Sequence, residues 1–275
     1  MPTVEENVGI WDGNYAWQDS GEEWSQPWGN STAQWYGCVY PRIQRFLPAK
    51  RILELAPGYG RWVEFLLPQC DSYIGVDLST RAIEACTQRF AGEKKATFAT
   101  NDGLTLPMVA DSSVDFAFCF DSFVHLEAET LASYLAELDR VLAPDGVAFI
   151  HHSNMGTYRR INDLLKPLGL LRLPAQMRLQ LDHIGVVSNT RWRGLSVTAS
   201  RFAELTEAAG LHCVGQELVN WGGGALLIDA MSVVTRPGSR WDRPNQVVKN
   251  RLFGVSARAV RRSGTVYDTT SPAPS

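Results

Sequence analysis

The sequence predicts an α/β fold built on one sheet of seven strands, mostly parallel and ending in an antiparallel pair. Three observations lead to this fold class. From Arg51 onward, short apolar segments alternate with amphipathic ones over about 100 residues, which implies right-handed crossovers with helices on both faces of a parallel sheet. A glycine-bearing turn follows the first apolar segment. Two apolar segments near the C-terminus are joined by the hairpin-like link Trp221-Gly222-Gly223-Gly224.

Each predicted element has a local signal. Apolar segments rich in β-branched or aromatic residues predict the strands, and apolar residues at helical spacing predict the helices. The strands are residues 51–55, 72–76, 96–99, 114–120, 147–150, 211–220 and 225–234. The helices between them are residues 61–67, 80–90, 127–142 and 200–209.

Three segments lie outside this pattern, so the core domain is residues 50–235. Residues 1–49 are irregular and aromatic, and five of the nine tryptophans fall within the first 35 residues, which predicts an aromatic N-terminal cap or lid. Residues 156–190 are rich in Leu and Arg and are interrupted by two prolines, which indicates a helical insertion over the sheet. Residues 236–275 predict a basic, partly disordered tail.

The composition narrows the function classes. Apolar residues make up 45% of the chain and charged residues 20%, as in globular proteins. The net charge of −3 lacks the basic footprint of a nucleic-acid-binding protein. No apolar run approaches the ~18 residues of a spanning helix, so we expect no membrane insertion. The N-terminus lacks a secretory leader, and the five cysteines are widely spaced without a CxxC pair, which predicts reduced thiols and a cytoplasmic location.

The strongest local signal is the segment ILELAPGYG, from Ile52 to Gly60. A buried strand leads into a turn whose glycines let the backbone approach a ligand closely. The spacing is E-x-A-x-G-x-G, whereas a dinucleotide site usually has G-x-G-x-x-G. Asp77 ends the second strand, 17 residues after Gly60, where a carboxylate can accept hydrogen bonds from both ribose hydroxyls. Because only Arg61 is basic near the turn, the pattern favours a nucleoside without phosphates.

These residues resemble motifs I and II of class I S-adenosylmethionine-dependent methyltransferases. Three more segments are similar to that family in the same order, namely NDG at 101–103, VDFAFCFDS at 114–122 and VLAPDG at 141–146. The resemblance implies a Rossmann-like methyltransferase sheet with S-adenosylmethionine as the cofactor, and a Rossmann-like dehydrogenase is the alternative. It also implies cofactor contacts at Tyr15, Glu54, Ala56, Gly58, Gly60, Asp77, Leu78, Asn101, Asp102, Gly103 and Asp121.

Polar side chains follow the fourth and fifth predicted strands, where ligands of open α/β sheets bind. They are Asp121, Ser122, His125, His151, His152, Ser153 and Asn154. An alcohol acceptor must lose a proton, and imidazole suits this task because its pKa is near neutrality. The predicted catalytic group is His152, Asp121 and His151. Alternation places the two histidines on opposite sides of the strand, and we expect His152 to be the general base, His151 to be packed, and Asp121 to orient the acceptor or a metal ion.

The residues leave the participation of a metal open. Asp121, His152 and Asn154 could ligate Mg²⁺ as carboxylate and amide oxygens do in metal-dependent O-methyltransferases, but histidine is a poor ligand for this ion. Glu217 and Asp229 are further carboxylates on the last two predicted strands. For both of them, a structural role and a role in the site are equally open.

The aromatic N-terminal segment indicates a saccharide acceptor, because sugars stack their apolar C–H faces on broad aromatic rings. The segments GEEWSQPWG, PRI, APGYGRW, FDSFVH, IHHSN and QELVNWGGG together resemble sugar O-methyltransferases of polysaccharide biosynthesis, including those that methylate the 1-hydroxyl of a 3-O-methylmannoside. We expect a homodimer, the commonest oligomer of soluble proteins. The alternatives are a methyltransferase for nitrogen or oxygen on a non-sugar small molecule, and a non-catalytic nucleoside-binding protein.

Overall fold

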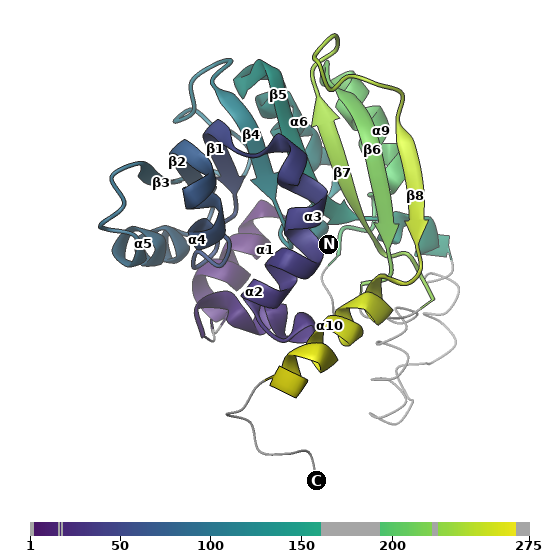
Figure 1. Ribbon diagram of the computed structural model, residues 1–275. Coiled ribbons are helices and arrows are strands. Elements are labelled where there is room, and N and C mark those ends of the chain that lie inside the picture. Colours follow the sequence, from purple (N-terminus) through teal and green to yellow (C-terminus); the bar gives the residue numbers. More distant parts are fainter. Residues whose placement is uncertain (1–2, 16, 18, 161–192, 222–224, 268–275) are drawn as a thin grey trace.

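The computed structural model describes residues 3–15, 17, 19–160, 193–221 and 225–267. Its centre is an eight-stranded sheet with the order β3-β2-β1-β4-β5-β7-β6-β8 (Figure 1). The strands are β1 (Ala49–Leu55), β2 (Cys70–Asp77), β3 (Ala96–Thr100), β4 (Val114–Cys119), β5 (Leu142–Ser153), β6 (His212–Val219), β7 (Asp229–Thr235) and β8 (Gln246–Asn250).

The strand directions confirm the predicted fold class. Strands β1 to β5 pair in parallel, and β7 runs antiparallel to both of its neighbours, β5 and β6. The eighth strand, β8, pairs in parallel with β6 and lies in the segment predicted to be a tail. Its side chains are exposed or half-buried, so it lacks the buried apolar pattern that identifies the other strands.

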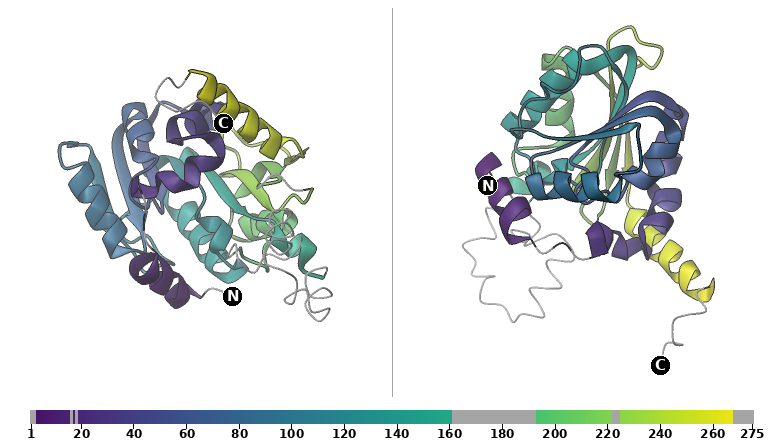
Figure 2. Two further views of the ribbon diagram at one scale, coloured as in Figure 1. Left: turned by 90° about the horizontal axis from the view of Figure 1, so that it is seen from below. Right: turned by 90° about the vertical axis from the view of Figure 1, so that its left-hand side faces the viewer.

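Helices cover both faces of the sheet (Figure 2), and an apolar core lies on each face. On one face, α6 and α9 pack against each other and against the core around Leu53 and Ile150. On the other face, α3, α4 and α10 surround the core around Phe116 and Trp28. The helices that follow β1 are α4 (Val63–Leu66), η5 (Leu67–Gln69), α5 (Thr80–Arg89), η6 (Phe123–His125), α6 (Ala128–Val141), η7 (Met155–Tyr158), α9 (Ala199–Ala208) and α10 (Phe253–Tyr267).

The N-terminal residues form a series of short helical segments before β1. The first begins with a reciprocal cap, in which Thr3 Oγ1 accepts from the Glu6 N–H and the Glu6 carboxylate accepts from the Thr3 N–H. Side chains of the first three segments lie against residues that follow β1, β2 and β4, at the carboxyl ends of these strands. The segments are α1 (Val4–Val8), η1 (Gly9–Asn14), η2 (Asp19–Trp28), α2 (Ser31–Gln34), η3 (Trp35–Val39), α3 (Tyr40–Ile43) and η4 (Gln44–Phe46).

The segment predicted to be a basic tail contains β8 and α10, so regular secondary structure continues to Tyr267. Phe253 at the start of α10 is 2% exposed, and its ring centroid lies 5.5 Å from that of Trp28. The Arg42 guanidinium of α3 lies over the same Phe253 ring at 5.5 Å. It also pairs with Glu217 of β6, with N–O distances of 2.6 and 2.7 Å. The apolar residues of α10 recur at helical spacing, and this packing explains why the segment is ordered despite its charge.

Some expectations concern residues outside the described part. Of the predicted helical insertion at 156–190, only residues 156–160 are described, so the insertion stays a prediction, as does disorder in residues 268–275. All five cysteines are buried free thiols. Among the described residues, no helix has both the length and the apolar character needed to cross a membrane.

We predict that Phe253→Ala lowers the free energy of unfolding by about 3 to 5 kcal/mol, because the ring is buried between aromatic partners and its loss leaves a cavity. Urea denaturation followed by tryptophan fluorescence measures this. The matched control is Val255→Ala two residues on, where the side chain is 49% exposed. We expect that variant to stay within about 0.5 kcal/mol of the wild type. Equal effects of the two substitutions would show that α10 is not packed on the fold.

Candidate active site

A cleft opens at the carboxyl ends of β1, β2 and β4, beside the N-terminal helical segments. It holds about 1000 Å³ of space, part of it open to solvent. Its wall combines the turn after β1, the end of β2, the loops after β3 and β4, and aromatic side chains of the N-terminal segments. The predicted site residues that line it are Ala56, Gly58, Asp77, Leu78, Gly103, Asp121, Ser122 and His125.

The turn after β1 is held in an unusual backbone conformation, with φ of 58° at Ala56 and 56° at Gly58. The Gly58 N–H donates to Asp77 Oδ2 at 3.0 Å, and the Ser79 N–H donates to Oδ1 at 2.9 Å. A Cβ at Gly58 would lie 2.9 Å from the Trp17 ring, so a glycine is required there. Burial raises the pKa of Asp77 to about 6. The carboxylate is thus fixed at the base of the cleft by backbone N–H groups.

Two residues of the predicted cofactor motif do not line the cleft and lie behind the turn. Glu54 is 1% exposed and accepts a hydrogen bond from Tyr73 Oη at 2.6 Å. Burial raises the pKa of Glu54 to about 8, so its carboxyl group is protonated at neutral pH. A Cβ at Gly60 would lie 2.6 Å from the Phe90 ring, so this glycine allows the end of α5 to pack closely. Both residues therefore pack behind the turn and stabilise its conformation.

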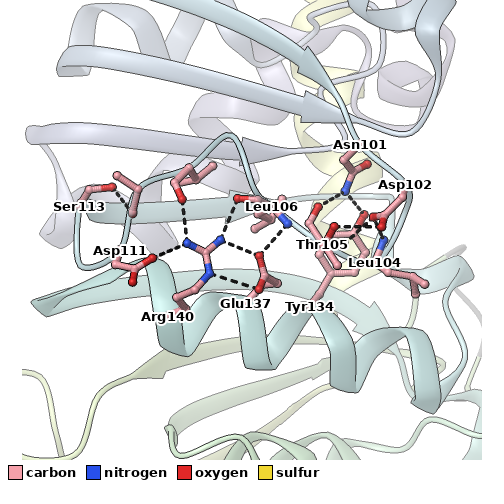
Figure 3. Close-up of polar contacts among 12 residues, drawn as sticks. Asn101, Asp102, Leu104, Thr105, Leu106, Asp111, Ser113, Tyr134, Glu137 and Arg140 are labelled. Atoms are coloured by element: carbon pink, nitrogen blue, oxygen red, sulfur yellow. Dashed lines mark hydrogen bonds and ion pairs between the residues drawn. The ribbon is translucent and has the colours of Figure 1, made fainter.

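The loop after β3 contains three residues predicted to contact the cofactor, and two of them form hydrogen bonds within the protein (Figure 3). Asp102 Oδ1 accepts from the Thr105 N–H at 2.6 Å, and Oδ2 accepts from the Thr105 hydroxyl at 2.9 Å. Asn101 Nδ2 donates to Tyr134 Oη at 3.0 Å, which attaches the loop to α6. Gly103, with φ of 78°, is the residue of this triplet that lines the cleft.

Three of the five N-terminal tryptophans line the cleft, namely Trp11, Trp17 and Trp24. Trp17 stacks on Tyr59 of the turn with ring centroids 4.6 Å apart. The Trp11 ring lies 5.2 Å from the ring of His125, which follows β4. These contacts connect the aromatic segment directly to the turn and to the loop that form the opposite wall.

Tyr15, Trp28 and Trp35 of this segment do not line the cleft. Tyr15 is stacked on Trp24 at a centroid distance of 5.5 Å, and its hydroxyl donates to Glu23 at 2.9 Å, so it does not line the cleft as predicted for a cofactor contact. Trp28 and Trp35 are 1% and 2% exposed and belong to the apolar core. The N-terminal tryptophans therefore divide into a cleft set and a core set.

A row of neighbouring charged and titratable side chains extends from the cleft into the sheet. Arg61 Nη2 lies 2.6 Å from Asp121 Oδ2, and Asp121 Oδ1 lies 3.2 Å from His151 Nδ1. On the other side of the ring, His151 Nε2 lies 3.4 Å from Asp229 Oδ2. Arg193 then pairs with Asp229 through two N–O contacts of 2.6 Å. Arg61 and Asp121 line the cleft, whereas His151 and Asp229 are fully buried behind them.

These contacts set the charge states along the line. Burial disfavours ionisation of Asp121, but Arg61 and His151 outweigh it and lower the pKa of that carboxyl. Burial also disfavours the imidazolium form of His151, but the nearby carboxylates of Asp121 and Asp229 raise its pKa above the usual value. Asp229 keeps a low pKa despite complete burial because Arg193 is paired with it. Two carboxylates therefore stay ionised on either side of one histidine.

His152, the predicted general base, lies on the opposite side of β5. Its ring stacks on Phe202 of α9 with centroids 3.9 Å apart. Its Nδ1–H donates to the Ser153 carbonyl at 2.9 Å, and its Nε2 lies 2.8 Å from the Ser232 hydroxyl. Burial lowers the pKa of His152 to about 3, so the ring is neutral. The structure brings His151 to Asp121 and places His152 in the core, the reverse of the expected arrangement.

The three candidate Mg²⁺ ligands do not converge. Asn154 Oδ1 accepts from the Ala199 N–H at 2.8 Å, and its Nδ2 donates to the Leu227 carbonyl at 2.7 Å, so the amide is used within the fold. Glu217 is paired with Arg42 and Asn250 and does not line the cleft. Across the part of the chain that the structure describes, no group of three or more His, Cys, Asp or Glu side chains could hold a metal ion.

Sequence reasoning noted Arg61 only as the basic residue after the turn and did not assign Tyr59, Thr130 or Tyr134 to the site. All four line the cleft. Arg61 and Tyr59 had a signal, since both belong to the segment APGYGRW. The two residues of α6 had none, because their contribution depends on how that helix packs beside β4.

Comparison with known proteins agrees with this geometry. Residues 52–146 match a family model described as a methyltransferase domain. A search of curated proteins gave no match. The matched region begins in β1 and ends within β5, so it contains the turn, Asp77 and the loop with Asp121.

Three solved structures share the fold over most of both chains. A SAM-dependent methyltransferase from Aquifex aeolicus is 13% identical, with a TM-score of 0.51, and the match covers 79% of this chain and 98% of the other. A SAM-dependent methyltransferase from Methanosarcina mazei is 16% identical, with a TM-score of 0.51 and coverage of 72% and 98%. A protein from Pyrococcus horikoshii is 18% identical, with a TM-score of 0.50 and coverage of 78% and 98%. The family model thus covers residues 52–146 of the 275-residue chain, and the solved structures show that this chain shares their fold.

The raised pKa of Glu54 predicts a specific dependence of stability on pH. The native state keeps a proton that the unfolded chain releases, so the free energy of unfolding falls as pH rises from 4.5 towards about 8. Glu54→Gln removes this dependence. Relative to the wild type, the variant should gain a few kcal/mol between about pH 5 and pH 8 in urea denaturation. Glu93→Gln, at an exposed position, is the control and should follow the wild type at both pH values. A stability difference between Glu54→Gln and the wild type that stays the same at about pH 5 and about pH 8 would contradict the assignment.

Proposed function

We propose that the protein is an S-adenosylmethionine-dependent O-methyltransferase that acts on a saccharide hydroxyl. One observation carries the proposal: a single cleft joins the turn at Gly58 and Asp77, three tryptophans, and the ionised carboxylate of Asp121. The first feature suits a nucleoside cofactor, the second suits the apolar face of a sugar, and the third suits a hydroxyl that must lose its proton.

The residues of the cleft fit S-adenosylmethionine, which supplies a methyl group bound to a cationic sulfur. Gly58 and Gly103 leave the wall without side chains at two points, and Leu78 adds an apolar surface beside Asp77. Each Asp77 oxygen accepts one backbone N–H, so lone pairs remain for the hydroxyls of a ribose. Glu54 and Gly60 would act indirectly, by holding the turn in its conformation, whereas Ala56 lines the cleft itself.

Asp121 is the residue we assign to the acceptor hydroxyl. It lines the cleft, and Arg61 and His151 keep it ionised, so it can accept a hydrogen bond from the hydroxyl and orient the oxygen. As the oxygen takes the methyl group, its proton passes to Asp121. Much of the rate enhancement comes from holding the two reacting atoms in line. His151 touches Asp121 and not the cleft, so it is a positioning residue, and it replaces His152 in the proposal.

The finer substrate assignment rests on the sequence resemblance. The segments shared with sugar O-methyltransferases support a role in polysaccharide biosynthesis, with the 1-hydroxyl of a 3-O-methylmannoside as the first acceptor to test. Trp11, Trp17 and Trp24 supply the stacking surface such an acceptor needs. A homodimer and a cytoplasmic location are part of the same proposal.

Ligand binding and turnover test the proposal directly. Saturating S-adenosylhomocysteine should raise the melting temperature by about 5 °C or more, because it binds only the native state, and NAD should not. Labelled S-adenosylmethionine with a panel of mannosides, other sugars and small amines should transfer label to a sugar hydroxyl. Parallel reactions with EDTA and with added Mg²⁺ measure any metal requirement. If S-adenosylhomocysteine does not raise the melting temperature, the cofactor assignment is wrong. If label is transferred only to amines, the acceptor is an amine and not a saccharide.

Three substitutions separate the roles of the polar residues. Asp121→Asn should lower kcat about 100-fold to 10,000-fold, because the proton acceptor is lost. His151→Gln should lower kcat less and change the pH dependence of kcat, since it acts through Asp121. His152→Gln should leave kcat within about threefold in steady-state assays of variants with native circular dichroism, because a group buried away from the reacting atoms makes no transition-state contact. If kcat falls strongly in His152→Gln and stays at the wild-type value in Asp121→Asn, His152 and not Asp121 is the general base.

A further inference from the structure

The C-terminal elements form a strongly basic surface that the cleft does not use. It consists of Arg243, Lys249, Arg251, Arg258, Arg261 and Arg262, all exposed, on and around β8 and α10. Residues 243–267 contain no Asp or Glu, so this segment carries a charge of +6 in a chain whose total is −3. Within the described residues, none of these six side chains forms an ion pair with a carboxylate. The charge is therefore available to a partner.

The same surface also exposes apolar side chains. The described residues include six exposed large hydrophobic side chains, and four of them lie here: Val247, Val248, Leu252 and Val255. Their exposed fractions are 53%, 59%, 66% and 49%. Clusters of exposed aliphatic side chains are uncommon on surfaces that face only water. Val247 and Val248 are adjacent on β8 and therefore point to opposite faces of the sheet, so we define the C-terminal surface as the six basic residues together with Leu252 and Val255.

The inner side of α10 is already occupied, so this surface faces away from the fold. Phe253 and Ala257 are buried against the core, and the Val260 side chain lies 3.3 Å from the position of a Cβ on Gly37. Arg258, Arg261 and Arg262 lie on the remaining sides of the same helix and are exposed. Figure 1 shows α10 extending from the foot of β8 beyond the body of the sheet.

We propose that the C-terminal surface docks the protein on an anionic lipid bilayer. The six cations complement the negative charge of such a surface, and the aliphatic side chains can enter the boundary between headgroups and acyl chains. The protein would lie on the bilayer without spanning it. This proposal concerns location and does not depend on which acceptor is methylated.

Charge and apolar character together favour this partner over two others. A second copy bound through the same surface would bring six cations against six cations across a two-fold axis, which is unfavourable without intervening carboxylates. A nucleic acid would pair with the arginines, but it offers no apolar layer for Leu252 and Val255. The bilayer is the partner that satisfies both features.

Vesicle sedimentation of the full chain tests the proposal. Phosphatidylcholine vesicles with roughly 30% phosphatidylglycerol should bind the protein at low salt, and binding should weaken at high salt and without the anionic lipid. The variant Arg258→Gln/Arg261→Gln/Arg262→Gln should weaken partitioning on the order of 100-fold. Leu252→Ser/Val255→Ser should also reduce it, because insertion is lost. Lys50→Gln/Lys94→Gln/Arg201→Gln makes the same charge change at exposed positions elsewhere and should bind as the wild type does.

Several results would overturn the proposal. They include no binding to anionic vesicles at low salt, equal binding to neutral vesicles, or equal loss in the control variant. A concentration-dependent dimer abolished by Leu252→Ser/Val255→Ser, without lipid binding, would assign the surface to a second copy. Binding to an RNA oligonucleotide that is tighter than to vesicles and lost in the triple arginine variant would assign it to nucleic acid. Thermal unfolding of each variant confirms that these exposed substitutions leave the fold intact.

Discussion

The candidate site depends on the ion pair between Arg61 and Asp121. Arg61 Nη2 lies 2.6 Å from Asp121 Oδ2, its Nη1 donates to Ser25 Oγ at 3.2 Å, and its guanidinium lies over the Trp62 ring at 4.4 Å. One largely buried cation thus connects the turn after β1, the N-terminal segment and the loop after β4. Loss of either charge would leave the other uncompensated in a site of low polarity, which costs more than the pair itself contributes. The aromatic wall of the cleft is therefore fixed relative to the strands by electrostatics as well as by packing.

The two adjacent histidines show how a strand separates identical side chains into different chemistry. On one side of β5, His151 is buried beside Phe120 and Trp221, which disfavours its charged form, but two nearby carboxylates outweigh burial and raise its pKa. On the other side, His152 meets Phe202 and neutral hydrogen-bonding groups, so burial dominates and its pKa falls to about 3. Alternation along the strand predicts that the two rings diverge. It does not predict which side faces the cleft, because that depends on α9, which is distant in sequence, covering one face of the sheet.

The sequence predicted what depends on local pattern and left undetermined what depends on tertiary packing. The mostly parallel sheet, the glycine-bearing turn after β1 and the position of Asp77 at the end of β2 all follow from periodicity and spacing. Asn101 and Asp102 resemble ligand contacts in sequence, yet a short polar loop satisfies its own backbone first, as Asp102 does with Thr105. Strand β8 was missed because an edge strand with exposed side chains carries no buried pattern. Its place in the sheet follows from pairing with β6.

The C-terminal helix also belongs to the architecture of the site, through a short series of ring contacts. The Phe253 ring lies 5.3 Å from that of Trp221, and the Trp221 ring lies 5.1 Å from that of His151. His151 is fully buried, and Trp221 is one of the rings that cover it. The effect of Asp121 and Asp229 on the imidazole depends on this exclusion of water, because charge interactions weaken steeply with solvation. Packing of Phe253 against Trp221 therefore helps to keep water away from His151. A segment that resembles a tail in sequence thus contributes to the packing around His151.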